Sequence, residues 1–203
     1  MHLRTLHPAV EERLRDALFG TSLTGIKATG EVYPLGGFLL VGAMVDMVAG
    51  LMHAPGRDND GRQAARYQAF IDRFFDERYR ALGMGQRMWD GLRCRPLHSF
   101  SAQGLLLADS QSSLGLHLHV RGDNVVLHWP EFVGDYERGL DRYWAELASD
   151  VALQKNAERR CQQYPPITVT SFPLGGLGFP LSFPFSFGSV ASAYGGPPVD
   201  FRN

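Results

Sequence analysis

Arg93 and His98, in the segment LRCRPLHSF, have the residue types and spacing of a site that handles an anion and a proton. Arginine keeps a permanent charge on a planar set of donors that fits the oxygens of a phosphate or carboxylate. Histidine titrates near neutral pH, so it can act as a general acid or base. Pro96 lies between them and forces Arg95 away from helical backbone angles or kinks the helix there. We therefore expect a compact structure between Arg93 and His98.

Asp46 is the third candidate, because it is the one carboxylate in the apolar run FLLVGAMVDMVAGLM. In a helix, spacings of three and four residues place four other residues on its face: Gly42, Ala49, Gly50 and His53. The small residues among them let a neighbouring backbone approach closely where the carboxylate points. A carboxylate in such a place rarely lacks a charged partner, so we predict that Asp46 orients or neutralises Arg93.

Three histidines form a second candidate site, for a metal ion. His117 and His119 share one face of a predicted strand, and His128 lies in the strand that follows. A carboxylate would complete the site, but the spacing fixes none of the candidates there: Asp109, Asp123 and Glu131. Two histidines at alternate positions of a strand more often form a half-exposed polar face. We therefore predict no metal and no other cofactor, and keep the histidine site as the alternative.

Cys94 and the glycine-rich segments offer less chemistry. A thiol beside His98 would be a nucleophile, but cysteines packed on helices are usually inert and no third group is evident to orient the pair. The LGG at residues 35–37 and the GMG at residues 83–85 lack the strand and the Lys-Ser/Thr of a nucleotide-binding loop. The sequence therefore indicates no nucleotide cofactor.

Composition limits the class of protein. A chain of 203 residues is long enough for one domain with a substantial core. The net charge is −1, with 20 Lys and Arg against 21 Asp and Glu, so any contact with nucleic acid needs a local patch. The two cysteines give no disulfide framework and the chain opens without the features of a signal peptide, so we expect a cytoplasmic protein.

The apolar stretch at residues 36–54 has about the length of a membrane span. It carries Asp46 at its centre and His53 near its end, and both are costly inside a bilayer. We therefore expect a buried core helix and no association with a membrane.

The apolar periodicity predicts a mainly α-helical bundle of about four to five helices with an inserted two-stranded β-hairpin. The clearest helices are expected over four stretches: residues 9–20, 38–52, 64–82 and 130–161. A Gly/Thr-rich link through Pro34 separates the first two. In the third stretch, six side chains should point inward: Tyr67, Phe70, Ile71, Phe74, Phe75 and Tyr79.

The hairpin is predicted at about residues 114–129. Apolar and polar residues alternate on both sides of the turn sequence GDN. In this register Val120 faces Val125, and His117 faces His128.

The helical domain is expected over residues 1–164, and a Pro/Gly/Phe-rich tail over residues 165–203. The tail has too much proline and glycine for a helix or an interior strand, so we expect it to be irregular. Three roles stay open for it: docking on a protein partner, covering the domain, or partial disorder.

Taken together, these residues resemble the HEPN superfamily, in which an Arg-x4-6-His motif on a small helical bundle marks many metal-independent endoribonucleases of toxin, CRISPR and other defence systems. An apolar helix with an acid, a Phe/Tyr-rich helix, LRCRPLHSF, a hairpin and a closing aromatic helix resemble a set of uncharacterised bacterial proteins of HEPN-like build. The resemblance covers roughly residues 8–160, and its sharp element is the pair of Arg93 and His98.

The resemblance implies an RNA-cleaving homodimer in which both motifs line one cleft. His98 would then be the acid/base at the 2′-hydroxyl, and Arg93 the clamp on the phosphate. Cys94 stands where active members commonly carry a polar residue, and the fold also serves as a binding module. The alternative is therefore a non-catalytic interaction or scaffold module of a larger assembly, with Arg93 and Asp46 as a buried ion pair. Whether the chain is an enzyme stays open at this point.

Overall fold

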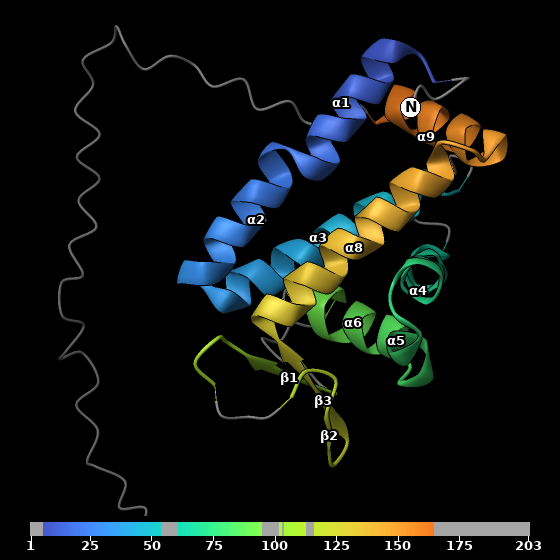
Figure 1. The fold of residues 1–203 in the computed structure, drawn as a ribbon. Coiled ribbons are helices and arrows are strands. Elements are labelled where there is room, and N and C mark those ends of the chain that lie inside the picture. Colours follow the sequence, from blue (N-terminus) through green and yellow to red (C-terminus); the bar gives the residue numbers. More distant parts are fainter. Residues whose placement is uncertain (1–5, 54–60, 95–101, 103, 113–115, 165–203) are drawn as a thin grey trace, which may run out of the picture. The chain divides into compact units, whose positions relative to one another are not determined.

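A computed structural model describes residues 6–53, 61–94, 102, 104–112 and 116–164 of the chain. The chain forms two units, residues 1–169 and 170–203, and all described residues belong to the first. The described part is mainly helical with a small sheet, as the sequence predicts (Figure 1). His98 and the tail at residues 165–203 lie outside the described residues.

Three helices begin the domain: α1 (Pro8–Phe19), α2 (Thr21–Val32) and α3 (Pro34–Leu51). The predicted Gly/Thr-rich link is wrong, because most of it is the helix α2. Leu23 and Ile26 are buried, and Gly30 lies so close to the Trp129 ring that an added Cβ would be 1.7 Å from it. Packing therefore outweighs the low helix propensity of the glycines and threonines in α2.

Four short helical segments follow: α4 (Gln63–Phe74), α5 (Glu77–Ala81), α6 (Met84–Met88) and the π-helix η1 (Trp89–Cys94). The helix predicted over residues 64–82 is therefore interrupted, at Phe75 and Asp76. The Asp76 side chain accepts a hydrogen bond of 3.0 Å from the Arg78 backbone N–H and so begins α5. All six side chains that were predicted to point inward are buried.

The sheet contains β1 (Leu105–Ala108), β2 (Val120–Arg121) and β3 (Asn124–His128), in the order β1-β3-β2. The predicted hairpin is present, and Val120 pairs with Val125 as expected. The sheet has one strand beyond this hairpin that the sequence did not predict, because β1 pairs in parallel with β3 on its other side. Its short, uniformly apolar LLLA run has no alternation that would identify a strand. The first predicted strand is also shorter than expected, since Leu118 has a φ of 60° and does not continue it.

The last helices are α8 (Trp129–Leu147) and α9 (Val151–Gln163). The prediction of a single helix over residues 130–161 is wrong, because the helical structure is interrupted between α8 and α9. The Asp150 side chain accepts hydrogen bonds from the N–H groups of Ala152 and Leu153, at 2.8 and 3.0 Å. This N-cap begins a new helix at a position where the apolar pattern of the sequence shows no interruption.

Helix α3 is central to the domain and contacts α2, α4, η1, α8 and α9. In Figure 1, α8 runs along the domain with α1 and α2 on one side and α4 to α6 on the other. Among the described helices, α3 is the one with the length and apolar composition of a membrane span, and half of it is buried inside the domain. That burial is typical of a core helix.

Candidate functional site

Asp46 and Arg93 meet, as the sequence predicts. Arg93 lies near the end of η1, and its Nε donates a hydrogen bond of 2.8 Å to Asp46 Oδ2 on α3. The two side chains keep 38% and 25% of their surface exposed, so the ion pair is partly buried and partly accessible. The bond uses one of the five guanidinium N–H donors, so an anion can bind the same side chain.

An apolar groove of about 370 Å³ begins at Arg93. Residues of α2, α3 and η1 line it: Thr29, Gly36, Leu39, Leu40, Ala43, Leu92 and Arg93. Large apolar side chains are also exposed on α2, on α3 and at the junction of these two helices: Val32, Tyr33, Leu35 and Leu40. The ion pair therefore borders an apolar surface.

Tyr67 lies on the inner side of the pair. Its ring packs edge-on against Trp89 at a centroid distance of 5.5 Å, and its buried hydroxyl has no hydrogen-bond partner among the described residues. Burial, and then the charge of Asp46, raise the pKa of the Tyr67 hydroxyl far above its usual value. This hydroxyl stays protonated near neutral pH and does not act as a base.

Cys94 follows Arg93 and is half-buried. Burial is the largest cause that raises the pKa of its thiol, and the guanidinium of Arg93 opposes it only in part. Because the thiolate is the nucleophilic form, this cysteine is poorly placed to act as a nucleophile.

His98, the other half of the predicted pair, lies outside the described residues together with Pro96.

The histidine side chains of the predicted metal site do not converge on one point, and His117 and His128 bond to different carboxylates. His117 Nδ1 accepts a bond of 3.1 Å from the His128 backbone N–H, and its Nε2 lies 3.0 Å from Asp135 Oδ2. Both ring nitrogens of His117 are thus engaged, with the proton on Nε2. His128 instead bonds to Glu131 one turn along α8, and His119 is exposed. In the part of the chain that the structure describes, no cluster of histidine, cysteine and acidic side chains is placed to hold a metal ion.

Asp135 and Tyr79 complete the His117 cluster, and sequence reasoning did not connect them. Tyr79 Oη donates to Asp135 Oδ2 at 2.8 Å and lies 2.9 Å from His117 Nε2. Burial alone would raise the pKa of Asp135, but hydrogen bonds from His117 and Tyr79 and the charge of Arg138 together lower it. A polar pocket of about 300 Å³ adjoins the cluster. Asp135 carried no sequence signal, because a polar residue on an amphipathic helix usually faces water.

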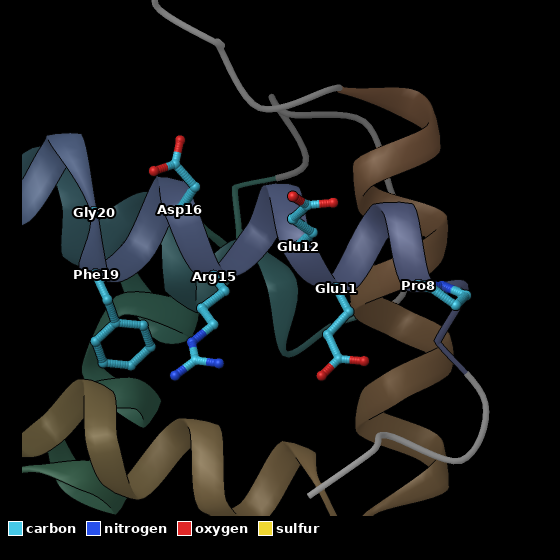
Figure 2. Close-up of a pocket in the computed structure, with 7 residues that line it drawn as sticks. All are labelled: Pro8, Glu11, Glu12, Arg15, Asp16, Phe19 and Gly20. Carbon is cyan, nitrogen blue, oxygen red and sulfur yellow. The ribbon is translucent and has the colours of Figure 1, made fainter.

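A further open pocket, of about 560 Å³, lies on α1. Its described lining is a mixed set: Pro8, Glu11, Glu12, Arg15, Asp16, Phe19 and Gly20. Figure 2 shows Glu12 and Asp16 on one side of the helix and Phe19 on the other. The Phe19 ring packs edge-on against Trp144 of α8. Of the described residues singled out for chemistry, none lines this pocket.

Comparisons of the chain with protein-family models, with curated proteins and with solved structures give no match. The HEPN resemblance therefore stays a prediction that rests on the residues quoted for it.

Proposed function

We propose that this chain is a cytoplasmic, HEPN-like endoribonuclease that works without a metal, as a homodimer, through Arg93 and His98. The observation that carries the proposal is the accessible Arg93 side chain, held by Asp46 and followed five residues later by His98. RNA is the substrate class because its 2′-hydroxyl supplies an internal nucleophile.

The proposed reaction needs one base and one cation. His98 removes the 2′-hydroxyl proton, and the 2′-oxygen attacks the adjacent phosphorus. Arg93 stabilises the additional negative charge of the phosphorane through two parallel N–H donors. The bond from phosphorus to the 5′-oxygen breaks, and this oxygen takes a proton from solvent water, which gives a 2′,3′-cyclic phosphate and a 5′-hydroxyl.

Asp46 acts in this proposal as the ground-state partner of Arg93. Exposed and half-exposed ion pairs contribute only about 0.2–1 kcal/mol. A phosphate can therefore bind the remaining N–H donors of the guanidinium while Asp46 keeps its bond to Nε. In the free protein, Asp46 keeps the long arginine side chain in one place and reduces the entropy lost on binding.

The homodimer is supported by the exposed apolar side chains between α2 and α3. Tyr33 and Val32 are at least 70% exposed, and Tyr33 is of a residue type that is common in interface hot spots. A contact there would place the groove at Arg93 beside a second protomer and bring two motifs together.

The second candidate is a non-catalytic module that binds a protein partner. It is favoured by the same apolar groove, whose lining contains one charged residue, Arg93, among those described. The Pro/Gly/Phe-rich sequence of residues 165–203 is a further candidate for partner binding.

Growth after induction separates the two candidates. Cells that produce the wild type should stop growing and show fragmented total RNA. Cells that produce His98→Ala at the same level of soluble protein should grow normally and keep their RNA intact. His119→Ala is the matched control, because His119 is exposed and lies outside the proposed site. Healthy growth and intact RNA with the wild type would favour the binding module.

A further inference from the structure

Helix α3 and the π-helix η1 approach each other closely at Gly42. A Cβ added to Gly42 would lie 2.9 Å from Leu92 Cβ and 3.2 Å from the Leu92 carbonyl oxygen. The atoms it would meet are backbone or Cβ atoms, which cannot swing aside as the end of a long side chain can. Only glycine at this position allows the two backbones to lie at this distance.

The same contact sets the position of the ion pair. Gly42 and Asp46 lie one turn apart on α3, and Leu92 and Arg93 are consecutive in η1. Leu92 packs on Gly42 while Arg93 bonds to Asp46 at 2.8 Å. The first contact therefore fixes both the distance between the helices and the rotation of η1 at which the second forms.

The π-helical turn makes this rotation important. A π-helix forms i to i+5 hydrogen bonds and has more residues per turn than an α-helix. Such turns are rare in proteins overall, but those that occur are often at functional sites. If residues 89–94 continued as an ordinary α-helix after α6, Arg93 would point in a different direction around the axis.

We infer that Gly42 is a positioning residue of the Arg93 site, which holds η1 against α3 in the register where Arg93 reaches Asp46. The inference rests on the proposed function only for its catalytic consequence. A larger residue at position 42 moves η1 away from α3 and releases Arg93 from Asp46, although neither charged residue has changed.

Hydrogen exchange of the Arg93 Nε–H in the full chain tests this inference. The proton is followed by nitrogen-edited NMR and assigned by its loss in Arg93→Lys. Gly42→Ala should accelerate its exchange by about fivefold, the factor that corresponds to the upper end of a half-exposed ion pair. Gly25→Ala is the matched control, because a Cβ at Gly25 meets nothing within 4 Å. Unchanged exchange in a folded Gly42→Ala variant would overturn the inference.

Leu92→Ala keeps the test decisive if Gly42→Ala does not fold. This variant retains the backbone and the Cβ that meet Gly42, so the domain should lose stability while the Arg93 Nε–H exchanges as in the wild type. Faster exchange by fivefold would show that the leucine side chain, and not the close backbone approach, positions Arg93. Neither measurement uses RNA, so an absence of cleavage by the wild type would contradict the proposed function and leave the positioning result intact.

Discussion

Arg93 Nε donates to Asp46 Oδ2 at 2.8 Å across 47 residues of sequence, and this bond joins the π-helix η1 to the central helix α3. It places a permanent cation at the rim of an apolar groove, with part of the guanidinium exposed. Every feature of the proposed site depends on this placement.

Asp46→Asn should weaken the site more than the fold. The variant keeps the size of the side chain but removes its charge, so the free energy of unfolding should fall by about 0.2–1 kcal/mol. RNA cleavage should fall further, because Arg93 loses the partner that holds it. Urea unfolding and a cleavage assay on the same preparation check both values. Asp141→Asn, an exposed position on α8, serves as the control, and equal cleavage by both variants would contradict the role of Asp46.

Tyr33→Asp should dissociate the proposed homodimer. A charge at a largely exposed aromatic position costs little in the folded monomer but is unfavourable inside an apolar interface. Sedimentation equilibrium at micromolar concentration should show a dimer for the wild type and a monomer for the variant. Tyr164→Asp, at another partly exposed tyrosine, should remain dimeric. A wild-type monomer would argue against a composite active site.

Asp135 should contribute stability that depends on pH. Its pKa in the folded protein is lowered, although burial opposes the shift, so the unfolded chain takes up a proton on this group at higher pH than the folded protein does. The contribution is therefore complete above the unfolded value of about 3.9 and is lost as the pH falls through the lower folded value. Urea unfolding should show Asp135→Asn less stable than the wild type at pH 7, with a gap that narrows below about pH 4. A gap that stays constant down to acid pH would refute this assignment.

Gly30→Ala should strongly destabilise the domain. An added Cβ would overlap the Trp129 ring at 1.7 Å, and this ring is buried in the core. Overpacking of this kind costs about 1–3 kcal/mol or more, which thermal and urea unfolding both measure. Gly25→Ala in the same helix meets no atom and should stabilise the domain by about 0.5–1 kcal/mol. Similar effects of the two substitutions would contradict the packing of α2 on Trp129.

The sequence predicted the elements whose periodicity is strong. The buried face of residues 64–82 and the pairing of Val120 with Val125 are both confirmed. Helix α2 was missed because its glycines lower helix propensity and its burial depends on a distant tryptophan. The breaks before α5 and α9 were missed because each depends on one aspartate cap, which leaves the apolar pattern unchanged.

The candidate site was predictable only where small residues and a lone carboxylate coincide. On α3 the sequence indicated a close backbone approach at the face of Asp46, and η1 makes that approach at Gly42. The π-helical register of η1 has no sequence signature. The cluster of His117, Tyr79 and Asp135 joins three separate segments, so spacing along the chain could not reveal it.

The most direct test of the proposed function is cleavage of RNA by the purified full-length protein in excess EDTA, with analysis of the product ends. We predict fragments with 2′,3′-cyclic phosphate from the wild type and from His119→Ala, and a loss of at least about 100-fold in His98→Ala and Arg93→Ala. Intact RNA with the wild type, or equal cleavage by all four proteins, would contradict the proposed ribonuclease.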